Sequence, residues 1–489
     1  MITPMTLSQV ADFCRISLNA ELKVPEDSSD GDAKFTRVNT DTRTLAAGEL
    51  FIALRGENFD AHNFLTQAVE KNVCGLVVEK FDSSIALPQL VVMDTVLALG
   101  QIAAMNRNLF AGPLLAITGS SGKTTVKTML AHILRECGDV LATQGNFNNH
   151  IGVPLTLLQI EKQHEYAVIE MGASAIGEIA YLCSLAKPQV TMVNNVMPAH
   201  IQGFGSIEGV AQAKGEIYQQ LPSNGTAVVN VDDKFSPQWL AEIKTKIIKV
   251  SLSNSNADCF ARNIVGGIGC VDFILVLNQQ EINIRLNAMG DHSVRNALMS
   301  AAMAAAVGAS LTKIKNGLER FSPVAGRMSR HVGVNQSLII DDSYNANPGS
   351  VRVALDVLAA TKGQRILVLG DLGELGENAA ALHTELGIYA QHKIDKLLTL
   401  GVLSRYASDA FGAFGTFGAG AVEHFTERDR LIETLTKIAT PNTTILIKGS
   451  RSAKMDLVVG ALCNLKEQQL SEHNLKKNQA EDHHLGGSH

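Results

Sequence analysis

Residues 114–125 have the sequence LLAITGSSGKTT, which decides the fold of the central part of the chain. The apolar run Leu114–Thr118 predicts a buried strand, and a helix is expected to begin at about Lys123. A glycine-rich turn joins the two. A strand that leads through such a turn into a helix is typical of a phosphate-binding loop in a doubly wound, largely parallel sheet.

The residue types in this loop fit phosphate chemistry. Glycines let backbone N–H groups approach phosphate oxygens, the helix N-terminus adds positive potential, Lys123 can reach the β- and γ-phosphates, and the Thr124 hydroxyl can bind Mg²⁺. Ile117 stands where the general phosphate-loop pattern has glycine, and an ordinary Gly/Ser turn is the alternative interpretation. The ATP-binding residues predicted in the loop are Gly119, Ser120, Ser121, Gly122, Lys123, Thr124 and Thr125.

Strand and helix patterns continue on both sides of the loop, and 489 residues suffice for about three domains at roughly 100 to 200 residues each. We expect an α/β protein with a small N-terminal α/β domain (1–110), a central doubly wound, mostly parallel sheet of the phosphate-loop type (111–323) and a Rossmann-like C-terminal α/β domain (324–464). Helices are predicted over Asn63–Lys71 and, buried, over Val294–Val307, with a loop over Ala410–Ala421 and a disordered tail over 465–489. The main predicted strands are Leu50–Leu54, Gly75–Val78, Tyr166–Met171, Val190–Val196, Thr226–Val231, Leu338–Ile340, Ile366–Leu369, Leu397–Leu400 and Thr444–Ile447.

The composition argues against several classes of protein. The 42 basic and 48 acidic residues give a net charge of -6 without a long basic run, which argues against a nucleic-acid-binding surface. No apolar run reaches the roughly 18 to 20 residues that span a bilayer, and Met1–Val10 lacks the features of a signal peptide. We therefore expect a cytoplasmic protein without a transmembrane segment. The seven scattered cysteines predict neither a disulfide framework nor a zinc cluster.

Three polar residues downstream of the loop are candidates for metal binding. Glu170 ends one predicted strand, His200 follows the next, and Lys214 lies shortly after it. Open α/β sheets bind ligands at the carboxyl ends of their strands, where Glu170 and His200 are expected. Taken singly, each could be a solvated or structural residue, and Lys214 could be an exposed helical lysine.

These stretches and others along the chain resemble the Mur ligase family of peptidoglycan synthesis. The similarity covers about residues 1–460, and its last two motifs are most similar to members that attach D-alanyl-D-alanine. The matching motifs are Asp41–Arg43, Phe51–Gly56, Gly119–Thr125, Glu170–Gly172, Pro198–His200, His292–Asn296, Gly326–Met328, Asp342–Pro348 and Gly370–Gly376.

The resemblance implies an ATP-dependent peptide ligase with Mg²⁺ and ATP as cofactors. In the implied reaction, ATP phosphorylates the terminal carboxylate of UDP-N-acetylmuramoyl-tripeptide, and the amine of D-alanyl-D-alanine attacks the acyl phosphate. The products are UDP-N-acetylmuramoyl-pentapeptide, ADP and phosphate. We expect these two substrates as the partners, no nucleic acid, and a monomer.

The resemblance also implies roles for residues of the central domain. Lys123, His200 and Lys214 are the candidate catalytic residues. Thr124 and Glu170 would bind a first Mg²⁺, while His200, Glu170 and Lys214 would serve a second. Lys214 matches a lysine that is carbamoylated in sister ligases, and a carbamate would supply the oxygen ligands that Mg²⁺ prefers.

Further roles fall on Asn296 of the central domain and on residues of both outer domains. Asn296 is implied to contact adenine and Arg327 the ATP phosphates, with an interdomain salt bridge as the alternative for Arg327. The implied ribose and adenine wall consists of Asp342, Tyr344 and Asn345, the candidates for the UDP end of the substrate are Thr42, Arg43, Arg55 and Gly56, and weaker candidates near the dipeptide are Asp371 and Lys448–Arg451. Thr42 replaces the usual serine of the family but keeps the hydroxyl.

Two other functions remain open from the sequence. A sister ligase that adds a single residue, or a folate polyglutamate synthase, would share the phosphate loop but not Asp342–Pro348. A nucleotide-dependent binding or motor protein would hydrolyse ATP without forming a peptide bond, and the absence of a basic stripe argues against a nucleic-acid partner.

Overall fold

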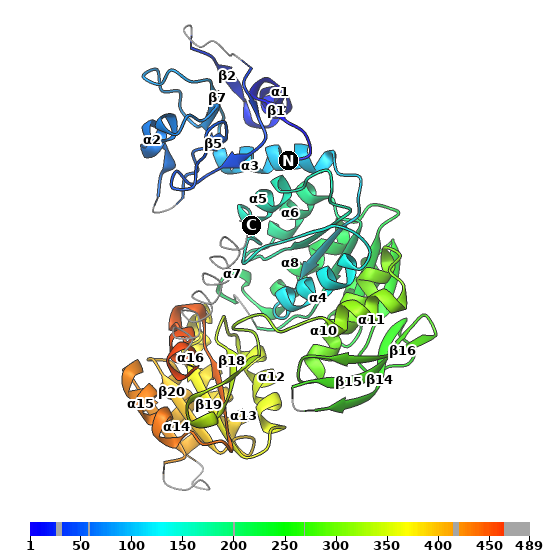
Figure 1. Cartoon of the computed structure of the whole chain (residues 1–489), viewed down its shortest axis with the longest axis vertical. Helices are drawn as coiled ribbons and strands as arrows, with labels where there is room; N and C mark the ends of the chain where they lie inside the picture. The colour runs from blue at the N-terminus through cyan, green and yellow to red at the C-terminus, as the bar shows by residue number, and fades with distance from the viewer. Residues whose placement is uncertain (26–31, 57–58, 199–200, 268, 414–419, 464–489) are drawn as a thin grey trace, which may run out of the picture.

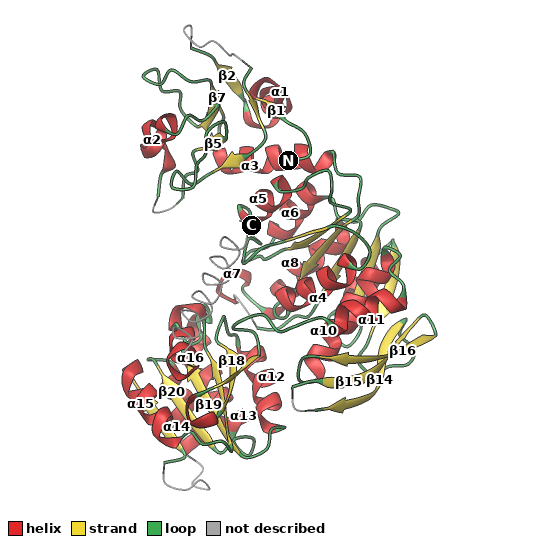
Figure 2. Cartoon of the chain, viewed as in Figure 1, coloured by secondary structure: helices red, strands yellow, loops and turns green. Residues whose placement is uncertain are grey.

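The computed structural model describes residues 1–25, 32–56, 59–198, 201–267, 269–413 and 420–463. Three main sheets follow one another along the long axis of the molecule, and helices flank each of them (Figures 1 and 2). The predicted α/β fold class is confirmed. Within the described ranges, no helix is both long and apolar enough to cross a membrane.

The N-terminal sheet has the strand order β2-β7-β6-β5-β4 and is parallel except where β2 pairs with β7. A short antiparallel pair of β1 and β3 lies beside it. The strand predicted over Leu50–Leu54 ends at Ile52, and the helix predicted over Asn63–Lys71 begins as a 3₁₀ turn. The elements are β1 (Met5–Thr6), α1 (Leu7–Leu18), β2 (Glu21–Lys23), β3 (Lys34–Phe35), β4 (Val38–Asn39), β5 (Leu50–Ile52), η1 (Ala61–Phe64), α2 (Leu65–Glu70), β6 (Gly75–Val78), β7 (Gln89–Val91) and α3 (Thr95–Asn108).

Helix α3 joins the first sheet to the central one. It packs against α1 on one side and against the central helices α5 and α6 on the other. Leu99 and Ile102 of α3 are fully buried in an apolar core that runs from Leu7 and Val10 to Leu114 and Leu182. The two sheets therefore share one apolar core. Burial of each such side chain contributes roughly 1.5–3 kcal/mol to its stability.

The central sheet has nine strands in the order β16-β15-β14-β13-β12-β11-β8-β10-β9. Strands β9 to β13, with β8, pair in parallel, whereas β14 to β16 form an antiparallel extension that the strand prediction missed. Helices α5, α6 and α8 cover one face of the sheet, and α4, α10 and α11 cover the other. The elements are β8 (Leu114–Thr118), α4 (Lys123–Arg135), β9 (Val140–Ala142), α5 (Gly152–Leu158), β10 (Tyr166–Glu170), α6 (Glu178–Ala186), β11 (Val190–Val193), α7 (Ile201–Phe204), α8 (Ile207–Gln219), β12 (Thr226–Asn230), α9 (Ser236–Glu242), β13 (Lys246–Val250), β14 (Cys259–Gly266), β15 (Val271–Leu277), β16 (Gln280–Leu286), α10 (Asp291–Ala306) and α11 (Leu311–Glu319).

The helix predicted over Val294–Val307 is α10, which is buried along most of its length. Its alanines let it approach α4, the helix that follows the phosphate loop. Helix α11 approaches α4 closely at Gly317, where an added Cβ would lie 2.3 Å from Ile133 Cα. Small residues on α10 and α11 therefore allow both helices to pack closely against α4.

The C-terminal sheet has the order β17-β18-β22-β19-β20-β21 and is parallel except for the β17–β18 pair. Helices α12 to α14 cover one face, and α15 and α16 the other. The elements are β17 (Ser329–Val332), η2 (Val334–Gln336), β18 (Leu338–Asp342), α12 (Pro348–Ala359), β19 (Gln364–Gly370), η3 (Gly376–Asn378), α13 (Ala379–Ala390), β20 (Lys396–Leu400), α14 (Ser404–Gly412), β21 (Val422–Phe425), α15 (Arg428–Ile438), β22 (Thr443–Lys448), η4 (Arg451–Ala453) and α16 (Asp456–Cys463).

The loop predicted over Ala410–Ala421 is wrong at its start, because Ala410 to Gly412 form the last residues of α14. Phe411 is fully buried there, so tertiary packing outweighs the low helix propensity of the neighbouring glycine. Residues 414–419 and the predicted tail at 465–489 lie outside the described residues.

Candidate active site between the central and C-terminal sheets

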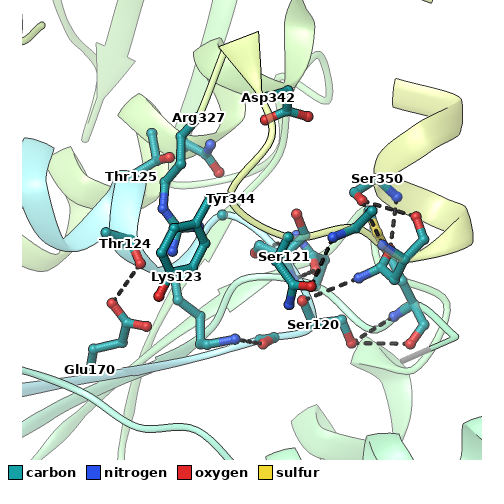
Figure 3. A pocket seen from close by; sticks show the side chains of 18 of the residues that line it. Ser120, Ser121, Lys123, Thr124, Thr125, Glu170, Arg327, Asp342, Tyr344 and Ser350 are labelled. Atoms are coloured by element: carbon teal, nitrogen blue, oxygen red, sulfur yellow. Dashed lines mark hydrogen bonds between the residues drawn. The ribbon is translucent and has the colours of Figure 1, made fainter. Parts of the chain in front are cut away.

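A cavity of about 510 Å³ lies between the central and C-terminal sheets. The phosphate loop, the end of β10, helix α10, the linker before β17 and the end of β18 all line it. Figure 3 shows side chains from the loop, from β10 and from the C-terminal domain in this cavity. The sequence-predicted residues that it brings together are Gly119 to Thr125, Glu170, Lys214, Asn296, Arg327, Asp342, Tyr344 and Asn345.

The phosphate loop is held in shape by two asparagines that follow β11. The N–H of Ser121 donates to Asn195 Oδ1 at 2.9 Å, and Asn194 Nδ2 donates to the Ser121 carbonyl, also at 2.9 Å. Gly122 has a φ of 77°, and a Cβ there would lie 2.5 Å from Asn194 Nδ2, so both conformation and space require glycine. Helix α4 begins at the next residue, Lys123, whose Nζ donates to the Gly119 carbonyl at 2.8 Å.

Glu170 is a buried acidic residue of the cavity with three side-chain partners. It ends β10 and is only 2% exposed. The Thr124 hydroxyl donates to its Oε2 at 2.8 Å, Asn148 Nδ2 donates to its Oε1 at 2.8 Å, and Lys127 Nζ lies 3.6 Å from Oε2. A carboxylate and a hydroxyl side by side provide the oxygen ligands that a hard divalent cation favours.

Lys214 lies on α8, where it is 2% exposed and lines the cavity. This burial contradicts the alternative of an exposed helical lysine. Its Nζ lies 5.7 Å from the centre of the Phe204 ring, and no hydrogen bond or ion pair joins it to another residue in the described ranges. Burial, and then the charge of Lys123, lower the pKa of Lys214 to about 7. His200, the residue predicted to act beside it, lies outside the described residues.

Helix α10 brings its polar residues to the far side of the loop. Asn194 Nδ2 donates to Asn296 Oδ1 at 2.9 Å, which leaves the amide nitrogen of Asn296 as its donor group. His292 precedes Asn296 by one turn and also lines the cavity. Burial, and then the charges of Arg295 and Lys448, lower the pKa of His292 to about 4.

This shift predicts that acid destabilises the protein through His292. Between pH 6.5 and pH 4 the unfolded chain binds a proton at this histidine that the folded protein does not bind. The free energy of unfolding should therefore fall as the pH drops through this window, by up to about 3 kcal/mol at 1.36 kcal/mol per pKa unit. Urea unfolding across the window should show a shallower pH dependence for His292→Gln than for the wild type. Equal slopes would contradict the assignment.

The C-terminal domain contributes cations and an aromatic ring. The Arg327 guanidinium lies 4.2 Å from the centre of the Tyr344 ring, and both side chains face the phosphate loop (Figure 3). Lys448 Nζ lies 2.5 Å from Asp342 Oδ2 and donates to the Asn345 carbonyl at 3.0 Å. Burial raises the pKa of Asp342, and the Lys448 charge opposes this shift.

Sequence reasoning missed several residues that shape this cavity. Asn148, Asn194 and Asn195 each hydrogen-bond to a predicted site residue, and Lys127 pairs with Glu170. A signal was present, because Asn194 and Asn195 lie near the end of the predicted strand Val190–Val196 and Asn148 lies in an asparagine-rich stretch. Lys448, a weaker candidate, does line the cavity.

Other candidates lie elsewhere. The Asp371 carboxylate accepts the N–H groups of Val402 and Ser404 at 2.8 and 2.7 Å, so it fixes the start of α14 and does not line the cavity. In the first domain Arg43 pairs with Asp41 at 2.6 Å, and Arg55 with Asp60 and Glu79 at 3.0 and 2.8 Å. Thr42, Arg43, Arg55 and Gly56 do not line this cavity, and their assignment to the UDP end stays a prediction.

A mostly parallel sheet with a phosphate loop, which faces a second α/β sheet across a shared cavity, is the arrangement of a nucleotide-dependent ligase. Residues 117–304 match the model of the Mur ligase middle domain, and residues 326–451 match that of the "Mur ligase, glutamate ligase domain". The chain belongs to the Mur ligase family.

Within this family, the chain is similar over most of its length to UDP-N-acetylmuramoyl-tripeptide–D-alanyl-D-alanine ligases. It is 43% identical to that ligase of Escherichia coli over 94% of this chain and 98% of the relative, and 42% identical to that of Haemophilus influenzae over 88% and 94%. The crystal structure of MurF from Acinetobacter baumannii superposes with a TM-score of 0.86, at 34% identity, covering 95% of this chain and 99% of that one.

Proposed function

We propose that the chain joins D-alanyl-D-alanine to the terminal carboxylate of UDP-N-acetylmuramoyl-tripeptide at the expense of ATP, as a step of peptidoglycan synthesis. The observation that carries this proposal is the end-to-end similarity to ligases of that name, at 43% identity over 94% of the chain. The cavity supports it, because the predicted ATP-side residues from two domains line one space. We further propose that the protein acts as a monomer in the cytoplasm.

The reaction would proceed through two transfers. An oxygen of the tripeptide carboxylate attacks the γ-phosphorus of ATP, the bond to the bridging oxygen breaks, and ADP leaves. The amine of D-alanyl-D-alanine then attacks the acyl phosphate carbon, phosphate leaves, and the amine loses a proton. Both steps bring anions together, so Lys123 and Arg327 would stabilise the charge that develops on the phosphates.

The residues in the cavity fit Mg²⁺ as a cofactor. Glu170 and Thr124 offer adjacent oxygens 2.8 Å apart, and a buried carboxylate at this position favours a cation. We propose that these two residues hold one Mg²⁺, which would supply Lewis-acid stabilisation of the phosphates. Asn148, bonded to the other oxygen of Glu170, would orient the carboxylate.

A second Mg²⁺ is proposed to involve Glu170, His200 and a carbamoylated Lys214. The pKa of Lys214 near 7 supports this, because a much larger fraction of the amine is neutral near pH 7 than in an ordinary lysine. Only the neutral amine attacks the carbon of CO₂, forming a carbamate and releasing a proton. The carbamate supplies the oxygen ligands that Mg²⁺ prefers, whereas a neutral amine is a poor ligand and an ammonium would repel the metal.

Nucleotide recognition and the substrate's other end are also proposals. Asn296 would contact adenine, and Asp342, Tyr344 and Asn345 would line the ribose and adenine. Thr42, Arg43, Arg55 and Gly56 of residues 1–110 would bind the UDP end, while residues 111–323 hold ATP and residues 324–464 close over it. Each of these three proposed roles falls on a range of the chain that contains one of the three main sheets.

The activity is tested by omitting each substrate in turn. Phosphate release should require ATP, UDP-N-acetylmuramoyl-tripeptide and D-alanyl-D-alanine together, and mass spectrometry should detect the pentapeptide product. Turnover with a single amino acid in place of the dipeptide would reassign the chain within the family. ATP hydrolysis without a new peptide bond would refute the ligase activity.

A further inference from the structure

Lys127 is a buried cation that the proposed mechanism does not use. It lies on α4 one turn after Lys123 and is 6% exposed. Its Nζ lies 3.6 Å from Glu170 Oε2, the ion-pair partner that the described part of the chain provides. Lysine is almost never fully buried unless it is paired, so the pairing with Glu170 accounts for its presence there.

The position of Lys127 relative to the cavity is informative. Glu170 and Thr124 line the cavity, but Lys127 does not. The ammonium therefore approaches the Glu170 carboxylate from the protein interior, behind the face that Glu170 presents to ligands. Thr124 and Asn148 already hold the two carboxylate oxygens at 2.8 Å, so Lys127 is not needed to orient them.

The electrostatic consequence follows from this geometry. A divalent ion bound to Glu170 would share this carboxylate with the Lys127 ammonium, and Glu170 and Lys127 are both shielded from bulk solvent. Salt screens buried charges poorly, so the repulsion between the two cations persists at physiological ionic strength. The phosphates of ATP would attract both cations and offset that repulsion.

We propose that Lys127 is a built-in counter-ion of Glu170 that weakens Mg²⁺ binding to the nucleotide-free enzyme, so that the ion is held firmly only together with ATP. The inference rests on the metal role proposed for Glu170. In this role Lys127 acts through its charge on the Glu170 site and does not itself contact the reacting groups.

The test compares Mg²⁺ binding by the wild type and by Lys127→Met, which keeps an unbranched, uncharged side chain of similar length. Titration calorimetry of the nucleotide-free protein with MgCl₂ alone should show a Kd for Mg²⁺ at least about tenfold lower in the variant. With ATP present, the affinity should change less, because the variant loses an attraction to the phosphates along with the repulsion. Neither measurement depends on turnover.

The controls separate charge, site and folding. Lys127→Gln should tighten Mg²⁺ binding as Lys127→Met does, and thermal unfolding checks that both variants fold. The exposed Lys244→Met should leave the Kd unchanged, and Glu170→Gln introduced into Lys127→Met should abolish the gain. An unchanged or higher Kd in both Lys127 variants, or a gain that survives the loss of Glu170, would overturn the inference. Absence of Mg²⁺ binding even with ATP would instead refute the proposed metal site itself, and the inference with it.

Discussion

Replacing Lys123 with alanine is expected to lower kcat/KM for ligation by about 10²- to 10³-fold or more, the usual loss when one preorganised donor to a charged transition state is removed. Lys123 opens α4 directly after Gly122, and its ammonium lies at the loop, 2.8 Å from the Gly119 carbonyl. Burial lowers the pKa of Lys123, and the charge of Glu170 opposes that shift. The ammonium is therefore poised in a poorly hydrated site, where its interaction with phosphate oxygens is strong.

The measurement is the rate of phosphate release with saturating tripeptide and dipeptide substrates over a range of ATP concentrations. Lys244→Ala, an exposed lysine of the central domain, serves as the matched control and should behave as the wild type. Thermal unfolding should show that Lys123→Ala keeps its fold, because among the described residues the side chain makes a single hydrogen bond, to the loop itself. Activity within a few-fold of the wild type would remove Lys123 from the proposed phosphate site.

The second large effect is expected at Lys214. Lys214→Ala should abolish ligation, and short carboxylic acids such as formate or acetate should partly restore it by placing an oxygen ligand where the carbamate would lie. The reason is chemical: the stem of Lys214 is buried at the cavity, but an amine is a poor ligand for Mg²⁺. Lys214→Arg, which cannot react with CO₂ in the same way, should also be inactive. Short carboxylic acids should rescue it less than they rescue the alanine variant.

Two observations complete that test. Supplying the wild type with isotope-labelled bicarbonate should produce a carbamate carbon signal in NMR spectra that Lys214→Ala lacks. Because the pKa of Lys214 is about 7, the modified fraction should fall as the pH drops below 7, where the amine is protonated. Full activity of Lys214→Ala would exclude a metal-binding carbamate at this position.

Much of the fold could be predicted from local pattern. Strands β6 and β8 have the predicted bounds, and α10 begins three residues before the predicted helix and ends one residue before its predicted end. These elements are buried on all sides, so their apolar runs are continuous and easy to recognise. The antiparallel strands β14 to β16 were missed. Exposed polar positions interrupt the apolar pattern of β14 and β16, whereas β15 between them has no exposed position.

Some residues of the candidate site could likewise be predicted from the sequence, and others could not. Thr124 and Glu170 could be predicted because each ends or follows an apolar strand, and their hydrogen bond confirms that the two lie together. Asn148, Asn194 and Asn195 could not be identified as site residues from the sequence, since asparagine is common in loops and turns. Nothing in the sequence distinguishes Lys127 from other helical lysines, and only the fold brings it beside the end of β10.

The sequence by itself determined the phosphate loop, the α/β architecture and the family, because each depends on residues that are adjacent in the chain or on motifs that can be compared directly. Only the tertiary structure decided which groups share a charge environment. The sequence does not show the charge environment of Lys123, Lys127 or Lys214, whereas in the fold burial lowers the pKa of each. Burial and Coulomb interactions depend on distances between segments that are far apart in the chain, and folding alone sets those distances.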